Sequence, residues 1–398
     1  MNVKHFSFAN KSSGAFNAAY RIHSCLKNKV NTSMCVVKNS YNDGNSIFKT
    51  NSIHKFIIYF KIYIIVIFKK ITKTKKFNPF SLSILPSFFS SHFNKSEKDT
   101  LIHLHWINFE MISIYEIGKI KTPIVWTIHD LWPISGIFHL EQKSSKNIII
   151  LLLDKLVKNL KKVFWKKKYF YLVAPSTWML EKILENTIIT NYKVCIIPNP
   201  IDLNFWKQEK KIQVNKKIII GFGAYNFLAD QNKGYDLFIE SLKILKYNNF
   251  NIQFKIVTFG DKFPQEIEEM GFEVYSFGEN LTEFEIRNFY NSIDLLVVPS
   301  RIESFGQVAT EAMACGCPVI GFNNSGLTDI VEHKKTGYLA TPFNPDDLTN
   351  GILWFYQNHQ QKYEVSKMCI KRVKENFSYE VVSQKYIDLY NEIIQIHQ

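Results

Sequence analysis

Hydrophobic residues along the chain form short runs that alternate with longer segments of helical spacing. The runs predict strands, expected at residues 3–8, 35–37, 101–104, 124–128, 171–174, 194–197, 217–222, 254–259, 294–298 and 319–322. Apolar residues recur every three or four positions in the predicted helices, at residues 15–28, 235–245, 282–291 and 379–396. Strands separated by helices are typical of α/β domains, whose parallel sheets are built from right-handed crossovers.

The length of the chain and one breaker-rich segment indicate two domains. A chain of 398 residues exceeds one ordinary core and suits two domains of roughly 200 residues each. The segment IPNPID at residues 197–202 follows the first series of strands and is the expected linker. We therefore expect an N-terminal domain at residues 1–200, a C-terminal domain at residues 201–378 and a final helix at residues 379–398.

The charge of the chain favours an anionic partner. Lys and Arg number 49 against 35 Asp and Glu, which gives a formal charge of +14. Phosphate-bearing small molecules, nucleic acid and an acidic membrane face all fit this balance, although no nucleic-acid-binding motif is present. Much of the excess is Lys set among Ile, Phe and Asn, a composition that also fits a low-GC genome.

Two Lys-rich apolar segments, residues 55–76 and 154–168, interrupt the first domain. Each fits a basic amphipathic helix at a membrane interface, and each also fits an ordinary packed helix with a solvated Lys face. The longest apolar run, residues 56–68, contains Lys61 and is shorter than the roughly 20 residues of a membrane span. The N-terminal residues lack the apolar core of a signal peptide, so we expect a cytoplasmic protein that rests on the inner membrane face.

The cysteines predict neither a disulfide framework nor a zinc site. None of the six forms a CxxC pair, and no His cluster stands beside one in the sequence. This pattern fits a reducing compartment. The cysteines are Cys25, Cys35, Cys195, Cys315, Cys317 and Cys369.

The strongest local pattern is LLVVPSRIESFGQVATEAMACGCPVIGF at residues 295–322. A buried strand breaks at Pro299, and a helix follows from about Gly306 to Cys315. Loops after parallel strands bind ligands in α/β sheets, and the start of a helix attracts anions such as a diphosphate. Glu303 and Glu311 lie eight positions apart, about 12 Å on a continuous helix, which favours two separate roles over one acid/base pair.

This segment resembles the Glu-seven-residues-Glu motif of family four of the retaining glycosyltransferases, a GT-B group. The likeness continues in several further motifs of the chain. They are Lys233–Gly234 before a helix, SGLTDIVE at residues 325–332, TGYL at 336–339, APSTW at 174–178 and the linker at 197–202. HLHWIN at residues 103–108 and WTIHDLW at 126–132 resemble first-domain motifs of a polysaccharide-assembly branch. The resemblance implies a GT-B fold, in which two Rossmann-like domains with parallel sheets face each other across a cleft and a final helix crosses back to the first domain.

The resemblance also implies roles for individual residues. Glu311 would hold the ribose hydroxyls of the donor, and Glu303 would contact hydroxyls of the transferred sugar. Lys233 would neutralise the diphosphate leaving group, and His129 would contact the donor sugar near the reacting centre. The remaining donor contacts would come from Gly14 and from the backbone of Phe305, Gly306 and Gln307.

The chain departs from the family pattern at several places. Ser13 precedes Gly14 where the family often has GlyGly, and the usual AsnGly of the linker is Asn199–Pro200. No Arg stands in GFGAYN at residues 221–226 to assist Lys233, so Arg301 is an alternative phosphate contact chosen on position alone. HLEQKS at residues 139–144 stands where related chains carry a Cys-rich insertion.

The implied reaction is retaining transfer of a sugar from a nucleoside diphosphate sugar to a hydroxyl of a lipid-linked surface-polysaccharide acceptor. The family mechanism is front-face, with domain closure that brings His129 toward Glu303, and it requires no metal and no cofactor beyond the nucleotide sugar. Two alternatives stay open. One is a GT-B nucleotide-sugar epimerase, and the other is a GT-B protein that binds a nucleotide sugar without transferase activity.

Overall fold

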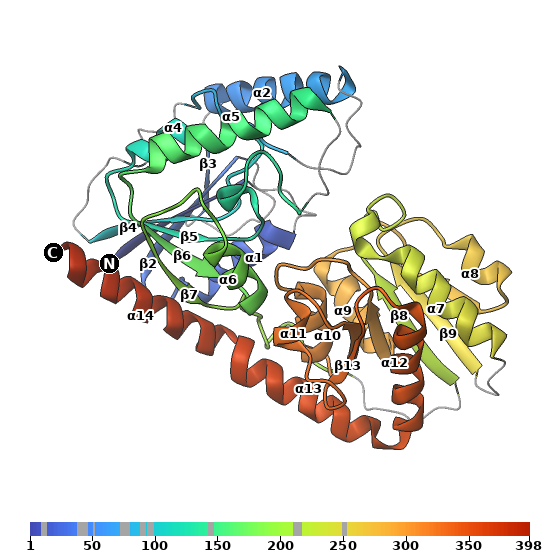
Figure 1. The fold of residues 1–398 in the computed structure, drawn as a ribbon. Coiled ribbons are helices and arrows are strands. Elements are labelled where there is room, and N and C mark those ends of the chain that lie inside the picture. The colour runs from blue at the N-terminus through green and yellow to red at the C-terminus, as the bar shows by residue number, and fades with distance from the viewer. Residues whose placement is uncertain are drawn as a thin grey trace. The chain divides into compact units, whose positions relative to one another are not determined.

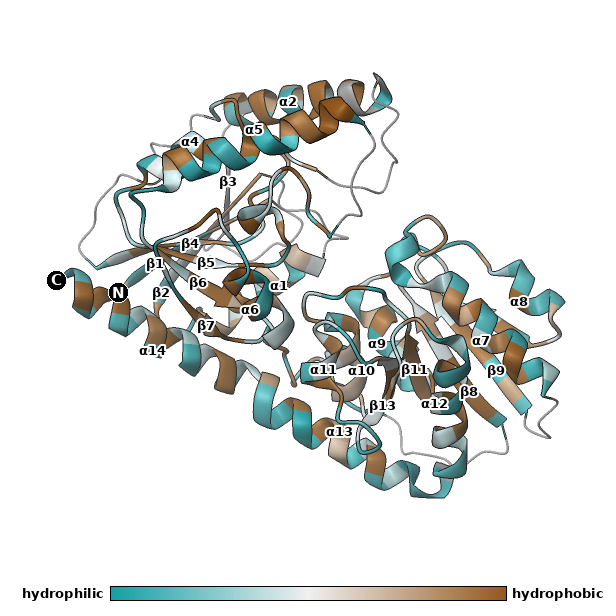
Figure 2. Ribbon diagram, viewed as in Figure 1, coloured by the Kyte–Doolittle hydropathy of each residue, from teal (hydrophilic) through white to brown (hydrophobic). Residues whose placement is uncertain are grey.

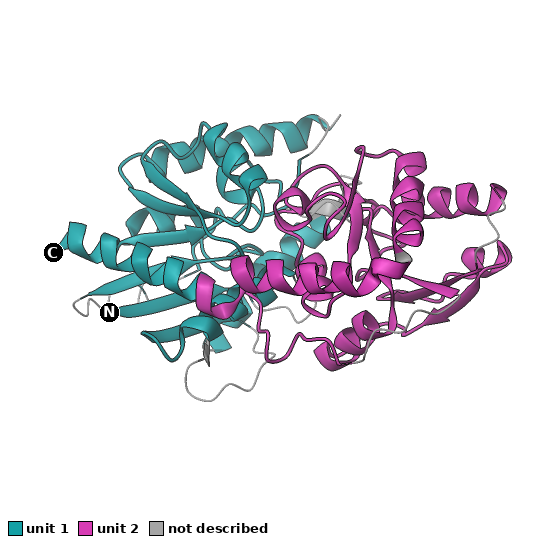
Figure 3. Cartoon of the chain, turned by 90° about the horizontal axis from the view of Figure 1, so that it is seen from below, with its two compact units in different colours: residues 1–198, 382–398 teal, residues 199–381 magenta. Residues whose placement is uncertain are grey.

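The computed structural model describes residues 1–8, 14–37, 47–50, 52–71, 80–87, 93, 99–141, 147–209, 217–248 and 253–398. The chain divides into two compact units, coloured separately in Figure 3. The first unit comprises residues 1–198 and 382–398, and the second comprises residues 199–381. The division after Pro198 lies two residues before the boundary expected from the sequence.

The first unit is built on a parallel sheet of seven strands with the order β3-β2-β1-β4-β5-β6-β7 (Figure 1). The strands are β1 (Asn2–Ser7), β2 (Asn31–Val36), β3 (Ile47–Lys49), β4 (Thr100–Leu104), β5 (Ile124–Thr127), β6 (Phe170–Ala174) and β7 (Tyr192–Ile196). The helices are α1 (Gly14–Leu26), α2 (Ser52–Ile71), α4 (Ile114–Lys119), α5 (Ile148–Trp165), α6 (Thr177–Leu184) and α14 (Tyr379–His397), with a short 3₁₀ turn η2 (Trp132–Ile134).

Side chains alternate across this sheet, because successive residues of a strand point to opposite faces. One face packs with α2, α4, α5 and α6 into a single apolar cluster that includes Phe6, Leu104 and Trp126. The alternate positions carry polar residues, including His5 and His103, which are directly paired between β1 and β4. Tyr386 and Tyr390 of α14 are buried against this second set.

The second unit contains a parallel sheet of six strands with the order β10-β9-β8-β11-β12-β13. Its strands are β8 (Lys217–Gly223), β9 (Gln253–Phe259), β10 (Glu273–Ser276), β11 (Leu295–Val298), β12 (Val319–Phe322) and β13 (Gly337–Ala340). Its helices are η3 (Gln231–Lys233), α7 (Tyr235–Tyr247), α8 (Gln265–Glu269), α9 (Glu283–Ser292), α10 (Gln307–Ala314), α11 (Leu327–Ile330), α12 (Pro345–Gln357), η4 (His359–Gln361) and α13 (Lys362–Phe377).

Helix α2 covers the described part of the first Lys-rich segment and α5 covers residues 154–165 of the second, and each helix turns a lysine inward. Lys61 of α2 donates to the Leu85 carbonyl at 3.1 Å and to Ser87 Oγ at 2.6 Å. Lys161 of α5 is fully buried and donates to the carbonyls of Ser135 and Gly136, both at 2.9 Å. The solvated Lys face, one of the two interpretations of these segments, therefore does not include Lys61 and Lys161. Residues 72–76 of the first segment lie outside the described residues.

Two further expectations from the sequence concern cysteines and membrane spans. All six cysteines lie in described segments and are free. In the described part of the chain, no helix has the length and apolarity that crossing a bilayer requires.

Candidate functional site

The strand order of the second sheet creates a site at its carboxyl edge. From β8 the chain runs outward through β9 and β10, then returns to the other side of β8 as β11. Ligands of open α/β sheets bind beside such a reversal, outside the carboxyl ends of the strands. The segments that follow β8 and β11 carry the predicted donor-binding residues of this unit.

Lys233 and Glu303 form an ion pair at this edge. Lys233 ends η3, the turn that follows β8, and Glu303 lies in the loop between β11 and α10. Lys233 Nζ is 3.1 Å from Glu303 Oε1, and both side chains remain partly open to solvent, at 27% and 17%. The carboxylate raises the pKa of Lys233, so the cation is secure at neutral pH.

Asn232, which directly precedes Lys233, links the two loops through hydrogen bonds. Its side chain donates to the Ile302 carbonyl at 2.8 Å and accepts from the Ile302 backbone N–H at 3.0 Å. The Asn232 carbonyl in turn accepts from the Arg301 backbone N–H at 2.8 Å. These three hydrogen bonds set the separation of Lys233 and Glu303, and no sequence pattern signals them.

Glycines permit the close approach of backbone segments around the pair. Gly234 has φ +67°, and a Cβ at this position would lie 1.9 Å from the Pro299 carbonyl oxygen. Gly326 packs against the same loop, where a Cβ would lie 2.6 Å from Phe305 Cα. Its N–H donates to the Glu303 carbonyl at 2.8 Å. Steric fit therefore requires the glycines of Lys233–Gly234 and Ser325–Gly326.

Helix α10 begins at Gln307, one residue later than expected, with Gly306 at its N-cap in the left-handed region (φ 108°). The N-cap glycine has no side chain with which to cap this helix end, which suits the helix start to an anionic ligand. The preceding residue, Phe305, is buried in the core of the unit. Glu311, on the same helix, is 7% exposed, and its Oε2 accepts from the Tyr290 hydroxyl at 2.9 Å.

Arg301 forms an ion pair with a carboxylate and does not point freely toward the carboxyl edge of the sheet. Its two terminal nitrogens contact Asp236 at 2.9 and 2.6 Å in a bidentate pair. Asp236 lies in the first turn of α7, directly after the Lys233–Gly234 motif. Arg301 would have to leave this pair to contact a phosphate, so its arrangement in the structure is that of a brace between the β11 loop and α7.

Gly14 and His129 belong to the first unit. Gly14 is the exposed first residue of α1, and a Cβ there would meet nothing within 4 Å among the described residues. Ser13 and the rest of the preceding loop lie outside the described residues. His129 follows β5, is 9% exposed, and its Nε2 lies 3.2 Å from Nδ1 of His105. Burial lowers the pKa of His129 to about 4, so this imidazole is neutral at pH 7.

The two first-domain motifs interlock around Asp130. Its Oδ2 accepts from Trp106 Nε1 at 2.6 Å and from Asn108 Nδ2 at 2.7 Å, and it lies 2.8 Å from Nδ1 of His139. The Trp132 backbone N–H donates to its Oδ1 at 3.0 Å. Asp130 therefore joins HLHWIN, WTIHDLW and His139, the residue that begins the segment where a Cys-rich insertion was expected.

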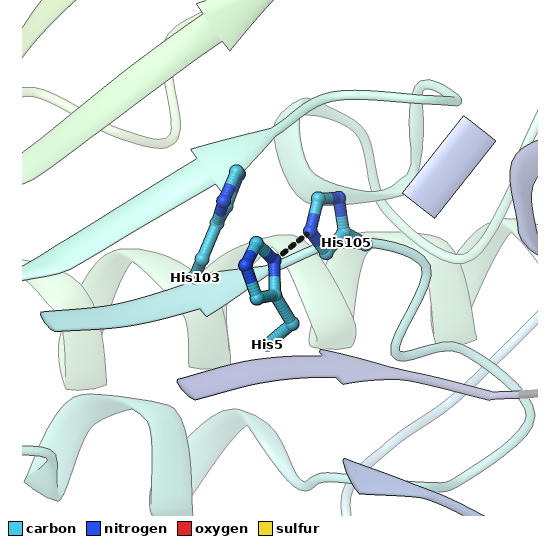
Figure 4. Close-up of side chains that lie close together, drawn as sticks. All are labelled: His5, His103 and His105. Carbon is cyan, nitrogen blue, oxygen red and sulfur yellow. Dashed lines mark hydrogen bonds between the residues drawn. The ribbon is translucent and has the colours of Figure 1, made fainter. Parts of the chain in front are cut away.

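His5, His103 and His105 lie together beside His129, as Figure 4 shows for the first three. One nitrogen from each of the three lies within 4.8 Å of the others, close enough to surround an ion. However, both nitrogens of His103 are engaged, by Tyr390 at 2.6 Å and Thr127 at 2.8 Å. Both nitrogens of His105 are engaged as well, by His5 at 2.9 Å and His129 at 3.2 Å. We therefore assign no metal to this cluster.

Comparison with known proteins agrees with this architecture. A family model described as "Glycosyltransferase Family 4" matches residues 60–205, and one described as "Glycosyl transferases group 1" matches residues 203–376. An uncharacterized glycosyltransferase of Methanocaldococcus jannaschii is 30% identical over 57% of this chain and 64% of its own length. The lipopolysaccharide 1,2-N-acetylglucosaminetransferase of Salmonella typhimurium is 26% identical over 48% of this chain and 55% of its own length.

Among solved structures, HepE of Anabaena in complex with UDP and glucose superposes with a TM-score of 0.64 and 17% identity, over 98% of this chain and 100% of that one. The matched regions span between 41% and 64% of the length of the first curated relatives. The two family matches adjoin near the division between the units, and the likeness to solved structures covers nearly the whole chain. The chain therefore belongs to the group 1 glycosyltransferases and has the GT-B fold.

Proposed function

We propose that this protein transfers a sugar from a nucleoside diphosphate sugar to a hydroxyl group, with retention of anomeric configuration. The observation that carries the proposal is the Lys233–Glu303 pair, held beside the uncapped start of α10 at the strand reversal of the second sheet. A diphosphate leaving group gains negative charge as the glycosidic bond breaks, and a fixed cation stabilises that charge. Glu303, paired with Lys233, supplies a carboxylate that accepts hydrogen bonds from hydroxyls of the transferred sugar.

The buried carboxylate of Glu311 is suited to the ribose. It accepts a hydrogen bond from Tyr290, and a carboxylate has acceptor capacity for further hydroxyl donors. The solved relative HepE binds UDP and glucose, which supports a nucleotide-sugar donor of this general kind. Because Lys233 provides the positive charge, we propose that turnover needs no metal ion and no cofactor.

A nucleotide-sugar screen followed by turnover would test this proposal. Thermal shift should first identify the donor, and transfer should then be measured with lipid-linked saccharide acceptors. Glu303→Ala and Lys233→Ala should each lower kcat/KM by at least a hundredfold. Glu240→Ala and Lys243→Ala remove an exposed ion pair of the same unit and serve as matched controls with unchanged rates.

Each alternative predicts a different outcome of the same assay. Near-wild-type rates in both Glu303→Ala and Lys233→Ala would overturn the site. Interconversion of the donor without an acceptor would indicate an epimerase, and tight donor binding without turnover would indicate a non-catalytic protein. NMR of the first-formed product decides between retention and inversion, and a rate that collapses with a chelator would contradict metal independence.

We further propose that the acceptor is a lipid-linked precursor of a surface polysaccharide and that the first unit rests on the inner face of the cytoplasmic membrane. The similarity to a lipopolysaccharide glycosyltransferase supports this acceptor class. Helices α2 and α5 pack on the same face of the first sheet, and Figure 2 shows hydrophobic and hydrophilic residues along both helices. Apolar side chains on them that are more than half exposed are Ile53, Phe56, Phe60, Tyr63, Ile148, Leu152 and Val163.

Exposed lysines accompany these apolar residues on α5 and just beyond it, at Lys155, Lys158, Lys162, Lys166 and Lys167. Apolar groups that insert among headgroups and cations that attract anionic lipid together bind a membrane surface. Vesicles with and without anionic lipid would test this. Phe56→Ser with Phe60→Ser should weaken binding to anionic vesicles at least tenfold, whereas Tyr247→Ser, a 90% exposed site on the second unit, should not. Binding that ignores both salt and anionic lipid would contradict the proposal.

A further inference from the structure

Three histidines of the first unit form a hydrogen-bonded chain that ends on His129. His5 lies on β1, His105 directly follows β4, and His129 follows β5, so three neighbouring strands contribute one ring each. His5 Nδ1 is 2.9 Å from His105 Nε2, a contact drawn in Figure 4. His105 Nδ1 is 3.2 Å from His129 Nε2. The rings of His5 and His105 are nearly parallel, 12° apart, with centroids at 5.2 Å.

The protons in such a chain must all point the same way. A neutral imidazole has one N–H donor and one acceptor nitrogen, and His105 uses both of its nitrogens in the chain. Protons therefore point either from His5 through His105 to His129, or from His129 through His105 to His5. The two arrangements differ in which nitrogen of His129 carries its proton.

The far end of the chain distinguishes the two directions. His5 Nε2 is buried and has no hydrogen-bond partner among the described residues. If the protons pointed toward His5, this atom would carry an N–H with no acceptor. If they point toward His129, it carries only an unused lone pair. Buried donors without an acceptor are rarer in native proteins than acceptors left short of a donor.

The charged forms of these rings are disfavoured by their surroundings. His5 and His103 are fully buried, His105 is 2% exposed, and burial lowers the pKa of each well below its ordinary value. The carboxylate of Asp130, the residue after His129 in the sequence, is hydrogen-bonded to Trp106, Asn108 and His139. The three histidines are therefore neutral, and the two possible arrangements differ only in the direction in which their N–H groups point.

We propose that His5 and His105 are positioning residues that lock His129 as a neutral imidazole with its proton on Nδ1. Nε2 of His129 is then committed as an acceptor inside the unit, and Nδ1–H is the edge that donates to a ligand oxygen. His129 acts in this arrangement as a hydrogen-bond donor of fixed polarity, and it takes no proton from the acceptor hydroxyl. The assignment of a ligand oxygen as the acceptor of this hydrogen bond rests on the proposed glycosyl transfer, whereas the assignment of the tautomer does not.

NMR of the full chain labelled with ¹⁵N-histidine would test the lock, because long-range ¹H–¹⁵N correlations separate the two neutral tautomers. At pH 7 the wild-type spectrum should show His129, assigned from His129→Asn, protonated on Nδ1. His105→Leu removes the donor to Nε2 and should shift His129 toward the Nε2–H form, which isolated imidazole side chains prefer. His105→Gln retains an amide donor and should restore the Nδ1–H form. His23→Phe changes a buried ring beside His5 that is outside the chain, and should leave His129 unaltered.

Kinetics adds a second readout that separates this inference from the proposed function. If the protein is a transferase, His105→Leu should lower kcat at least tenfold with little change in the KM for the donor, and His105→Gln should recover most of it. If no transfer is found, the tautomer measurement still stands alone. Wild-type His129 protonated on Nε2, or a His129 tautomer unchanged in His105→Leu, would overturn the lock. Should His105→Leu fail to fold, the wild-type and His105→Gln spectra decide.

Discussion

Single atoms decide where the second unit can tolerate change. Gly234 has φ +67°, and its missing Cβ leaves room for the Pro299 carbonyl. Gly278 has φ +86°, and a Cβ there would meet nothing within 4 Å among the described residues. The two positions share a left-handed backbone and differ in steric surroundings. They therefore separate the cost of the backbone conformation from the cost of a clash.

We expect Gly278→Ala to lower the free energy of unfolding of the second unit by about 1–2 kcal/mol, the usual cost of a left-handed alanine. Gly234→Ala should lower the free energy of unfolding by more than this, because the loop after β11, which contains Pro299, must also move. It should impair donor binding too, since Lys233 is the preceding residue. Urea unfolding of both variants measures the difference. Equal losses would show that the Pro299 contact relaxes without cost.

The buried histidines make the stability of the first unit depend on pH. The pKa of His129 is about 4 in the folded protein against 6.5 when unfolded, so the unfolded chain takes up a proton first as the pH falls. Stability is therefore retained above pH 6.5 and lost progressively down to pH 4. His129 alone should account for about 2 kcal/mol at pH 5, and His5, His103 and His105 act in the same direction.

Urea unfolding at pH 7.5 and pH 5.0 measures this loss, with the transition of the first unit followed separately. His129→Asn should show a smaller loss between the two pH values than the wild type. A transition of the first unit that is equally stable at both pH values would contradict buried, neutral histidines.

At the scale of elements, helix α5 combines a solvent-facing row of lysines with one lysine that acts as a core residue. Lys161 donates to the carbonyls of Ser135 and Gly136 and lies 3.7 Å from the ring centroid of Trp132. It thereby satisfies the backbone of the turn that follows η2. Burial lowers the pKa of Lys161 well below its ordinary value, and the nearby Asp130 and Asp154 oppose that shift.

Lys161→Met should destabilise the first unit by about 3 kcal/mol, because it leaves buried carbonyls without a donor. Lys162→Met, the exposed neighbour, should change stability by less than about 0.5 kcal/mol. Thermal unfolding of the two variants provides the comparison. A Lys161→Met protein as stable as the wild type would mean that the turn finds other donors.

The sequence predicts most elements and few of their contacts. Strand positions follow from apolar runs, so β8, β9, β11 and β12 appear within a residue or two of their observed bounds. The burial of Lys61 and Lys161 was not predicted, because a lysine reads as polar in the amphipathic pattern whether it is buried or solvated. Asn232 lacked any signal, because its partners come from a loop 70 residues away.

The histidine chain was partly within reach of the sequence. His103 lies on β4, His105 directly follows that strand, and His129 follows the neighbouring strand β5, which places the three at the ends of adjacent strands. The contribution of His5 was not accessible in this way, because β1 pairs with β4 only as a result of the strand order of the whole sheet. Roles taken from the family resemblance, such as those of Glu303 and Glu311, stay predictions until variants are measured.

At the scale of the whole molecule, the end of the chain is part of the first unit. Residues 382–398 belong to it, and Val382, Tyr386, Tyr390 and Ile393 are fully buried. The Tyr386 and Tyr390 hydroxyls hydrogen-bond Thr127 and His103. Helix α14 is therefore an integral layer of the first unit.

Truncation after Val381 should unfold the first unit selectively, since each large apolar side chain removed from its site forfeits about 1.5–3 kcal/mol. The second unit, residues 199–381, should keep its own unfolding transition. Calorimetry and hydrogen exchange would report the two units separately. Truncation after Ile394 removes only exposed residues and is the control. Loss of both transitions in the longer truncation would show that the units depend on each other for stability.

The return of α14 also fixes the order in which the protein is completed on the ribosome. All strands of the first unit are synthesised before residue 199, but the tyrosines that cover His103 and Thr127 emerge only after residue 381. At about 5–20 residues per second, the intervening chain takes on the order of 10–40 s to make. During this interval the face of the first unit that carries His103 and Thr127 lacks the tyrosines of α14. The second unit, in contrast, is fully synthesised once residue 381 has been added. The second unit is thus the first to be complete, and residues 382–398 finish the unit that was begun first.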